Sequence, residues 1–204
     1  MQTVVIHPDR CVGCMQCSVA CAVAHSQSQQ LYSAVFESPK TTPRIHVGAG
    51  PGALAFPNKC RHCDPAPCMR ACMPRAISRD VQTDAVLVNP SRCINCGMCA
   101  MACPFGVIRY AEDWRSALSS RVAVKCDNCV ERQKEGREPA CVETCMVGAL
   151  EFGDPNEILK EQSKRVAREA SLGLRAEGLA ETPPTAAVAL WRTLATAADR
   201  AKPQ

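Results

Sequence analysis

Two short apolar runs stand at equivalent places along the chain. They are Val4-Val5-Ile6 and Val86-Leu87-Val88, and each comes shortly before a stretch rich in cysteine. Short runs of this kind, rich in β-branched residues, are typical of β-strands. We therefore expect a short strand to lead into each of two cysteine-rich loops.

The part of the chain after residue 153 has a helical pattern and contains no cysteine. Asp154-Pro155 is a helix-start signal. Apolar positions then roughly trace one helix face: Ile158, Leu159, Val166 and Ala170. The prolines at 183 and 184 break this pattern, and residues 185–200 predict a second helix with Trp191 on its apolar side. We expect the first helix to pack on the cysteine-rich body, and the second is a candidate for docking on a partner subunit.

Composition explains why packing alone is not expected to hold the first part of the chain together. The 204 residues are 47% hydrophobic, but this fraction includes sixteen cysteines, and only 4% of residues are aromatic. Small domains with thin cores usually need cross-links or metals. An even number of cysteines is compatible with disulfides, zinc or iron–sulfur clusters.

The start of the chain bears on which of these applies. Residues 1–8 have no basic segment, no long apolar segment and no twin arginine, so we expect no signal peptide and a cytoplasmic location. There the thiols stay reduced and free to bind metal. A partner with its own export signal is the alternative route out of the cytoplasm. The best apolar stretch, residues 186–198, is short and contains Arg192, so we expect no transmembrane span.

The sixteen cysteines fall into four groups of four, with none left over. In chain order these groups are Cys11, Cys14, Cys17 and Cys21; Cys60, Cys63, Cys68 and Cys72; Cys93, Cys96, Cys99 and Cys103; and Cys126, Cys129, Cys141 and Cys145. Groups one and three follow C-x₂-C-x₂-C-x₃-C, which is the bacterial ferredoxin run. Two-residue gaps let one tight loop wrap three corners of a cubane, while the fourth cysteine lies a helical turn further on and reaches a second cluster. Zinc sites use cysteine pairs and need no third cysteine at that spacing.

Groups two and four are looser, and each alone would also suit zinc. Their spacings are C-x₂-C-x₄-C-x₃-C and C-x₂-C-x₁₁-C-x₃-C. Beside groups one and three, they are better interpreted as the other two ferredoxin halves with inserted loops. The insertion in group four, residues 130–140, is rich in charge, and we expect it to be a solvated surface loop.

The chain also repeats itself in the order A, B, A′, B′. The segment from His7 to Cys11 matches 89–93, and Lys59-Cys60 with the next three residues matches 125–129. Each ferredoxin module needs two groups. Spacing alone permits group one with four and two with three, or group one with two and three with four, and both pairings stay open at this point.

With these motifs in place, residues 1–153 resemble the ferredoxin-type electron-transfer subunits with four [4Fe–4S] clusters that accompany molybdenum and tungsten enzymes, hydrogenases and carbon monoxide dehydrogenases. The resemblance implies an α+β fold of two interleaved bacterial-ferredoxin-like modules with a helical tail. Module one would comprise residues 1–21 and 104–153, module two residues 60–103, with a linker at 22–59 and the tail at 154–204. It also implies how the sixteen iron ligands are shared: Cys11, Cys14, Cys17 and Cys145; Cys21, Cys126, Cys129 and Cys141; Cys60, Cys63, Cys68 and Cys103; and Cys72, Cys93, Cys96 and Cys99.

Within this family the segment 59–68 looks most like the carbon-monoxide-dehydrogenase-associated iron–sulfur protein. One departure is that Cys21, Cys72 and Cys145 lack the proline that often follows the last cysteine. This bears on loop geometry more than on ligation, because the cysteines themselves remain.

Several residues beside the cysteines permit two interpretations. Lys59 and Lys125 either raise the potential of a nearby cluster or are solvated, and His62 is a candidate hydrogen-bond donor to a cluster sulfur rather than a ligand. His7 and His25 are expected to be structural. Six of the seven methionines lie in or beside the cysteine groups, and we expect them to fill gaps.

The expected function is therefore electron transfer without catalysis. Four oxidised clusters with their thiolates would change the formal charge from +4 to about −4, so the basic balance does not indicate nucleic-acid binding. The chain would relay single electrons between a catalytic subunit and a second carrier or membrane complex, through which it could lie at the inner face of the membrane. The catalytic subunit would belong to a carbon monoxide dehydrogenase, formate dehydrogenase, aldehyde oxidoreductase or hydrogenase. The rival classes are a zinc-binding scaffold and an enzyme with its own active site, for which the sequence offers no catalytic residues.

Overall fold

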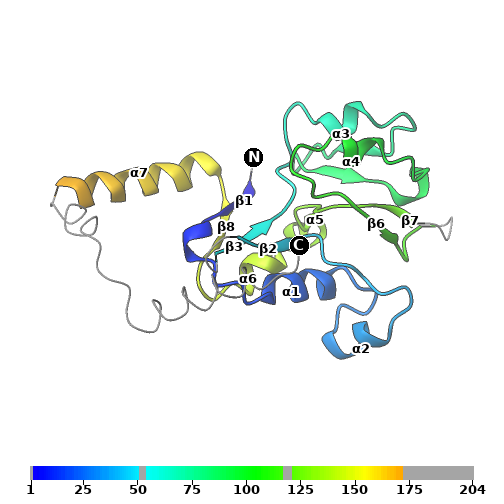
Figure 1. Cartoon of the computed structure of the whole chain (residues 1–204), viewed down its shortest axis with the longest axis horizontal. Helices are drawn as coiled ribbons and strands as arrows, with labels where there is room; N and C mark the ends of the chain where they lie inside the picture. Colours follow the sequence, from blue (N-terminus) through cyan, green and yellow to red (C-terminus); the bar gives the residue numbers. More distant parts are fainter. Residues whose placement is uncertain (1, 51–53, 117–120, 172–204) are drawn as a thin grey trace, which may run out of the picture.

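The computed structural model describes residues 2–50, 54–116 and 121–171 (Figure 1). Within these ranges the fold is a small α+β arrangement of short strands in antiparallel two-stranded sheets, joined by short helices. The strands are β1 (Thr3–Ile6), β2 (His46–Ala49), β3 (Ala55–Asn58), β4 (Ile77–Arg79), β5 (Val86–Val88), β6 (Arg109–Glu112), β7 (Arg121–Val124) and β8 (Leu150–Gly153). The helices are α1 (Gln16–Ala24), α2 (Leu31–Phe36), α3 (Pro67–Arg70), α4 (Met98–Met101), α5 (Val130–Lys134), α6 (Ala140–Glu143) and α7 (Pro155–Ser171).

The first sheet joins the two ends of the cysteine-rich region. Strand β1 pairs with β8, with Ile6 opposite Leu150. Buried Val4 and Leu150 form a core cluster with Ile45 and the cysteines Cys21 and Cys141. Helices α1 and α6 lie side by side beneath this sheet (Figure 1). Residues near the start of the chain thus pack against residues near position 150.

A second core cluster lies around sheets β4–β5 and β6–β7. It combines buried aliphatic residues such as Ile77 and Val122 with the cysteines Cys68, Cys93 and Cys99. Strands β6 and β7 belong to the span 104–153 that was expected in module one, yet they pack here, against residues of 60–103. Cysteine is thus a regular component of both cores.

The repeat in the sequence is visible as repeated local structure. Strands β1 and β5 are the two apolar runs that predicted strands, and each leads into a one-turn 3₁₀ helix, Pro8–Arg10 or Pro90–Arg92. Proline suits the first position of such a turn, because its fixed φ matches and the N–H it lacks has no partner there. Each turn ends directly before the first cysteine of a group.

The span expected as a linker, residues 22–59, contains regular structure. It includes α2 and the hairpin of β2 and β3, with His46 opposite Asn58. Ile45 and the side chain of Arg44 are buried, so this span also contributes to the core around Cys21.

Helix α7 begins at the predicted Asp154-Pro155 signal but packs differently from expectation. Ile158 contacts Gly153 at its start, whereas Leu159 is half exposed and most of the later residues are exposed. The helix projects away from the body because only its first turns find an apolar partner (Figure 1). The second predicted helix, with Trp191, lies outside the described residues. No helix in the described ranges is long and apolar enough to span a membrane.

Candidate metal centres

Each cysteine group begins with a C-x₂-C loop that has the same backbone turn. The residue just before the second cysteine has a positive φ in all four loops: 71° at Gly13, 49° at His62, 56° at Asn95 and 60° at Asn128. This left-handed conformation is tolerated by glycine and asparagine and strained for most other residues. The turn lets consecutive cysteines of one loop face the same centre.

Replacing Asn95 tests the importance of this turn. We expect Asn95→Val to destabilise the third loop by about 1–2 kcal/mol, because a β-branched side chain is strained at positive φ. The matched control is Asn95→Gly, which keeps the conformation and should retain the same iron content and melting temperature as the unaltered protein. The measurement is iron per chain together with thermal unfolding under anaerobic conditions. Equal behaviour of the two variants would contradict the assigned turn.

Three cavities of similar size are each lined by four cysteines from two different groups. The first lies at group one, the second at group two and the third at group three. In the same order the cysteines are Cys11, Cys14, Cys17 and Cys145; Cys60, Cys63, Cys68 and Cys103; and Cys72, Cys93, Cys96 and Cys99. Most of the other lining residues are apolar, such as Leu150, Ile108 and Ile77. Four sulfurs in an apolar enclosure suit a cubane cluster, which takes one thiolate at each iron.

The remaining four cysteines, Cys21, Cys126, Cys129 and Cys141, lie close enough to repel one another as thiolates. Burial raises the pKa of all four thiols, to about 12 for Cys129. The charge of Cys126 contributes to this rise in the other three. Four crowded thiols that resist ionisation fit a site where the charge of a metal core stabilises the thiolates.

Hydrogen bonds to sulfur occur around these cysteines. Backbone N–H groups donate to cysteine Sγ atoms over 3.2–3.4 Å from Arg44 to Cys21, His62 to Cys60, Ala76 to Cys72, Ala123 to Cys93 and Asn128 to Cys126. The Tyr110 hydroxyl lies 3.2 Å from Cys99 Sγ, and burial, followed by this contact, raises the pKa of the tyrosine. Such bonds stabilise charge on a ligand sulfur and are one of the means by which a protein sets a cluster's potential.

His62 lines the second of the three cavities and is itself fully buried. Its Nδ1 accepts a hydrogen bond of 3.0 Å from the Val86 N–H, so in the neutral ring Nε2 carries the proton. Burial, with the nearby charges of Lys125 and Lys59, lowers the pKa of His62 to about 2. Nε2 is buried without a partner among the described residues. A buried orphan donor beside four thiols fits a cavity that holds an acceptor, as the sulfide of a cluster would be.

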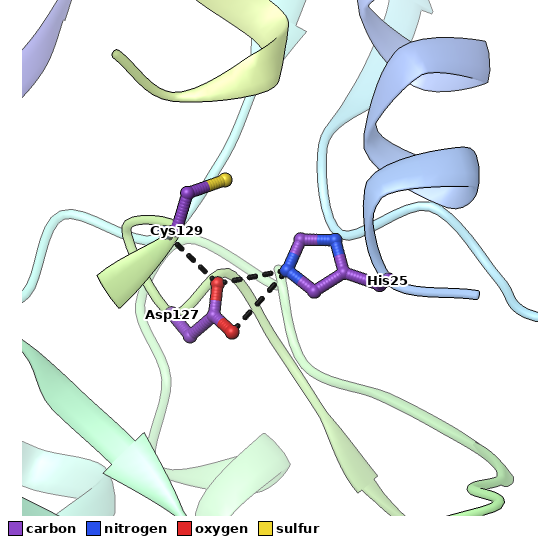
Figure 2. Close-up of side chains that lie close together, drawn as sticks. All are labelled: His25, Asp127 and Cys129. Carbon is purple, nitrogen blue, oxygen red and sulfur yellow. Dashed lines mark hydrogen bonds and ion pairs between the residues drawn. The ribbon is translucent and has the colours of Figure 1, made fainter. Parts of the chain in front are cut away.

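Figure 2 shows the side chains of His25, Asp127 and Cys129 close together. Their potential ligand atoms lie within 4.8 Å of one another. His25 Nε2 donates to the Asp127 carboxylate over 3.0 and 3.2 Å, and the Cys129 N–H donates to it over 3.0 Å. Arg44 is a third donor to the same carboxylate. Burial alone would raise the pKa of Asp127, but the His25 hydrogen bond and the Arg44 charge lower it far below its usual range. Because three donors already occupy the carboxylate, we interpret this cluster as a brace between α1 and the fourth cysteine group.

Sequence reasoning missed Arg44 and Tyr110 and left the state of Lys59 and Lys125 open. The structure buries Arg44 and both lysines. The methionines also differ from expectation, because Met73, Met101 and Met146 are strongly exposed rather than filling gaps. For the lysines the sequence did carry a signal, since both stand directly before a cysteine at equivalent places of the repeat.

Comparison with known proteins agrees with this chemistry. A family model of the 4Fe-4S dicluster domain matches residues 52–155, and one of the 4Fe-4S binding domain matches residues 8–24. The chain is 38% identical to the iron-sulfur protein of Rhodospirillum rubrum, covering 72% of this chain and 80% of that protein.

Two further relatives come from Escherichia coli strain K12. The electron transport protein HydN is 35% identical, with 82% of this chain and 96% of HydN covered. The putative oxidoreductase UacF is 38% identical over 78% of this chain, but the match spans only 22% of UacF. The relatives that match over most of their own length are thus named as iron–sulfur or electron transport proteins. The chain belongs to the 4Fe-4S ferredoxin-type family of electron-transfer iron–sulfur proteins.

Proposed function

We propose that the chain holds four [4Fe–4S] clusters and relays single electrons through them. The observation that carries this proposal is the gathering of the cysteines into quartets. Three quartets line cavities, and the cysteines of the fourth lie close enough to repel one another when ionised. When bound, cubane clusters supply one-electron oxidation and reduction. The chain's own contribution is to hold the iron through sixteen thiolates, exclude water with apolar walls and direct N–H groups at the sulfurs.

Shared helices support an order for the four quartets. Helix α1 carries Cys17 of the quartet of Cys11 and Cys21 of the quartet of Cys126. It lies beside α6, which contains Cys141 of the quartet of Cys126. Helices α3 and α4 also lie in contact. Helix α3 carries Cys68 of the quartet of Cys60, and α4 carries Cys99 of the quartet of Cys72. The exposed cysteines, Cys14 and Cys96, belong to the quartets of Cys11 and Cys72. We therefore place those two at the ends of the relay and the quartets of Cys126 and Cys60 in the middle.

The same contacts support two interleaved ferredoxin-like modules. The pairing of β1 with β8 brings groups one and four together, and one core cluster joins groups two and three. Because β6 and β7 pack in this second core, we propose that module two extends through about residue 124. Module one would then comprise the start of the chain and the segment from Lys125 to Gly153.

The electrons would pass between a catalytic oxidoreductase subunit and a second carrier, with no reaction of a substrate on this chain. The iron–sulfur subunit of the nitrate-inducible formate dehydrogenase of Escherichia coli strain K12 is 30% identical, over 83% of this chain and 60% of that subunit. This supports a formate dehydrogenase as one candidate partner, and the segment 59–68 supports a carbon monoxide dehydrogenase as the other. Reconstituted electron transfer from each purified enzyme to this protein would distinguish them.

The test of the relay is to measure iron, acid-labile sulfide and zinc in anaerobically purified protein, with EPR after dithionite reduction. We expect about sixteen irons per chain and the signals of magnetically coupled cubanes. About eight irons would contradict the four-cluster proposal, and zinc in place of iron without an EPR signal would support a structural scaffold.

A further inference from the structure

Two lysines at equivalent places of the repeat, Lys59 and Lys125, have buried side chains. Lys59 is 0% exposed and Lys125 is 3% exposed. In the parts of the chain that the structure describes, no carboxylate lies within ion-pair distance of either ammonium. A buried charge without a counter-charge costs several kcal/mol, so such a pair needs compensation from another source.

The contacts of Lys125 show which cysteine quartet its side chain faces. Its Nζ donates to the carbonyl of Val86, to the carbonyl of Cys126 over 3.1 Å and to Cys60 Sγ over 3.7 Å. The three N–H groups of a lysine ammonium serve these three acceptors. Lys125 also lines the cavity of Cys60, Cys63, Cys68 and Cys103. Lys125 therefore precedes Cys126 in the sequence, but its ammonium group lies beside the quartet of Cys60.

Lys59 has a different contact. It precedes Cys60 and donates to the Cys60 backbone carbonyl over 3.2 Å. The sulfur contact of Lys125 therefore makes Lys125 the lysine that acts on a cluster ligand, and Lys59 is its matched comparison.

We propose that Lys125 raises the reduction potential of the cluster held by Cys60, Cys63, Cys68 and Cys103, although it belongs by sequence to the motif of Cys126. The inference rests on the proposed four-cluster relay. A buried positive charge beside a cluster favours the state with one more electron. An ammonium at this place also reduces the repulsion between two neighbouring clusters of negative charge. The thiolates in turn provide the counter-charge that the lysines lack.

The experiment is a potentiometric EPR titration of the full chain with Lys125→Met and Lys59→Met. Methionine keeps the length and apolar stem but removes the charge. Lys125→Met should shift the cluster of Cys60, Cys63, Cys68 and Cys103 to a more negative potential, with a smaller shift of the cluster of Cys126. Lys59→Met should shift the potential of the cluster of Cys60 less than Lys125→Met does, because Lys59 donates to a backbone carbonyl and Lys125 donates to a ligand sulfur. Signals are assigned with Cys68→Ser and Cys141→Ser, each of which alters one middle cluster.

Matched controls separate charge from packing. Lys125→Arg and Lys59→Arg keep the charge and should return the potentials toward those of the unaltered protein. A Lys125→Met variant with full iron and unchanged potentials would overturn the inference, as would a larger shift of the cluster of Cys126. If Lys125→Met loses iron, loss of the cluster of Cys60 supports the inference, and loss of the cluster of Cys126 overturns it. Failure of the relay proposal itself is recognised separately, from the iron and zinc content of the unaltered protein.

Discussion

Removal of iron is expected to unfold the body of the protein rather than to leave a folded scaffold. Among the described residues seven cysteines are buried in the hydrophobic core, and no phenylalanine, tyrosine or tryptophan is buried there. The sheets have two strands each, which is marginal for independent stability in water. The bonds from iron to cysteine therefore replace most of the apolar packing that a domain of this size would otherwise use. Anaerobic treatment with an iron chelator should abolish cooperative thermal unfolding and most near-UV circular dichroism.

The control for this prediction is reloading with ferrous iron and sulfide, which should restore both signals. Helix α7 serves as an internal comparison, since its exposed residues contact the core only near its start. Its amide hydrogen exchange should be nearly the same with and without iron, while that of β4 and β5 should rise sharply. A metal-free chain that still unfolds cooperatively would show that packing alone suffices.

The second large effect is expected from Cys141→Ser, compared with Cys14→Ser. Both variants should lose about a quarter of the iron, because each removes one ligand of one cluster. Cys141 is buried with 6% exposure, whereas Cys14 is exposed. A serine at position 141 also buries a hydroxyl, which costs about 1–3 kcal/mol when it finds no partner. Cys141→Ser should therefore lower the free energy of unfolding more than Cys14→Ser.

The same pair tests the order of the relay. Loss of a middle cluster separates the two ends, so electrons that enter at one end should no longer reach a partner at the other. Loss of the end cluster near Cys14 should still permit reduction of the remaining three by a partner that docks near Cys96. Stopped-flow absorption measures both rates. Equal rates of reduction of the remaining clusters in the two variants would contradict the proposed order.

Local features were the most predictable from the sequence. The strands at residues 4–6 and 86–88 and the start of α7 follow from apolar runs and a helix-start signal. The hairpin of β2 and β3 was missed because Gly48 and Pro57 interrupt the expected alternation, and proline normally argues against a strand. Arg44 was missed because its partner, Asp127, lies 83 positions away along the chain.

The pairing of the cysteine groups shows the same limit. Spacing identified all sixteen cysteines as candidate ligands but allowed two pairings, because both satisfy the local motif equally. The contact of β1 with β8, which no local pattern encodes, supports the proposed pairing of group one with group four. The repeat marked Lys59 and Lys125 as equivalent but did not predict their burial, since lysine is rarely buried and only the folded chain surrounds it with acceptors.

The pairing of β1 with β8 also has a consequence for how the protein is made. Ile6 leaves the ribosome long before Leu150, its partner, has been synthesised. At a typical elongation rate the wait is on the order of ten seconds. Throughout that interval the first three cysteines lack Cys145, which lines the same cavity. Residues 60–124, by contrast, contain a core of their own and can fold and take up iron on the nascent chain. The proposed module of the chain start and residues 125–153 would therefore be the last to close, and its thiols would depend longest on a reducing environment.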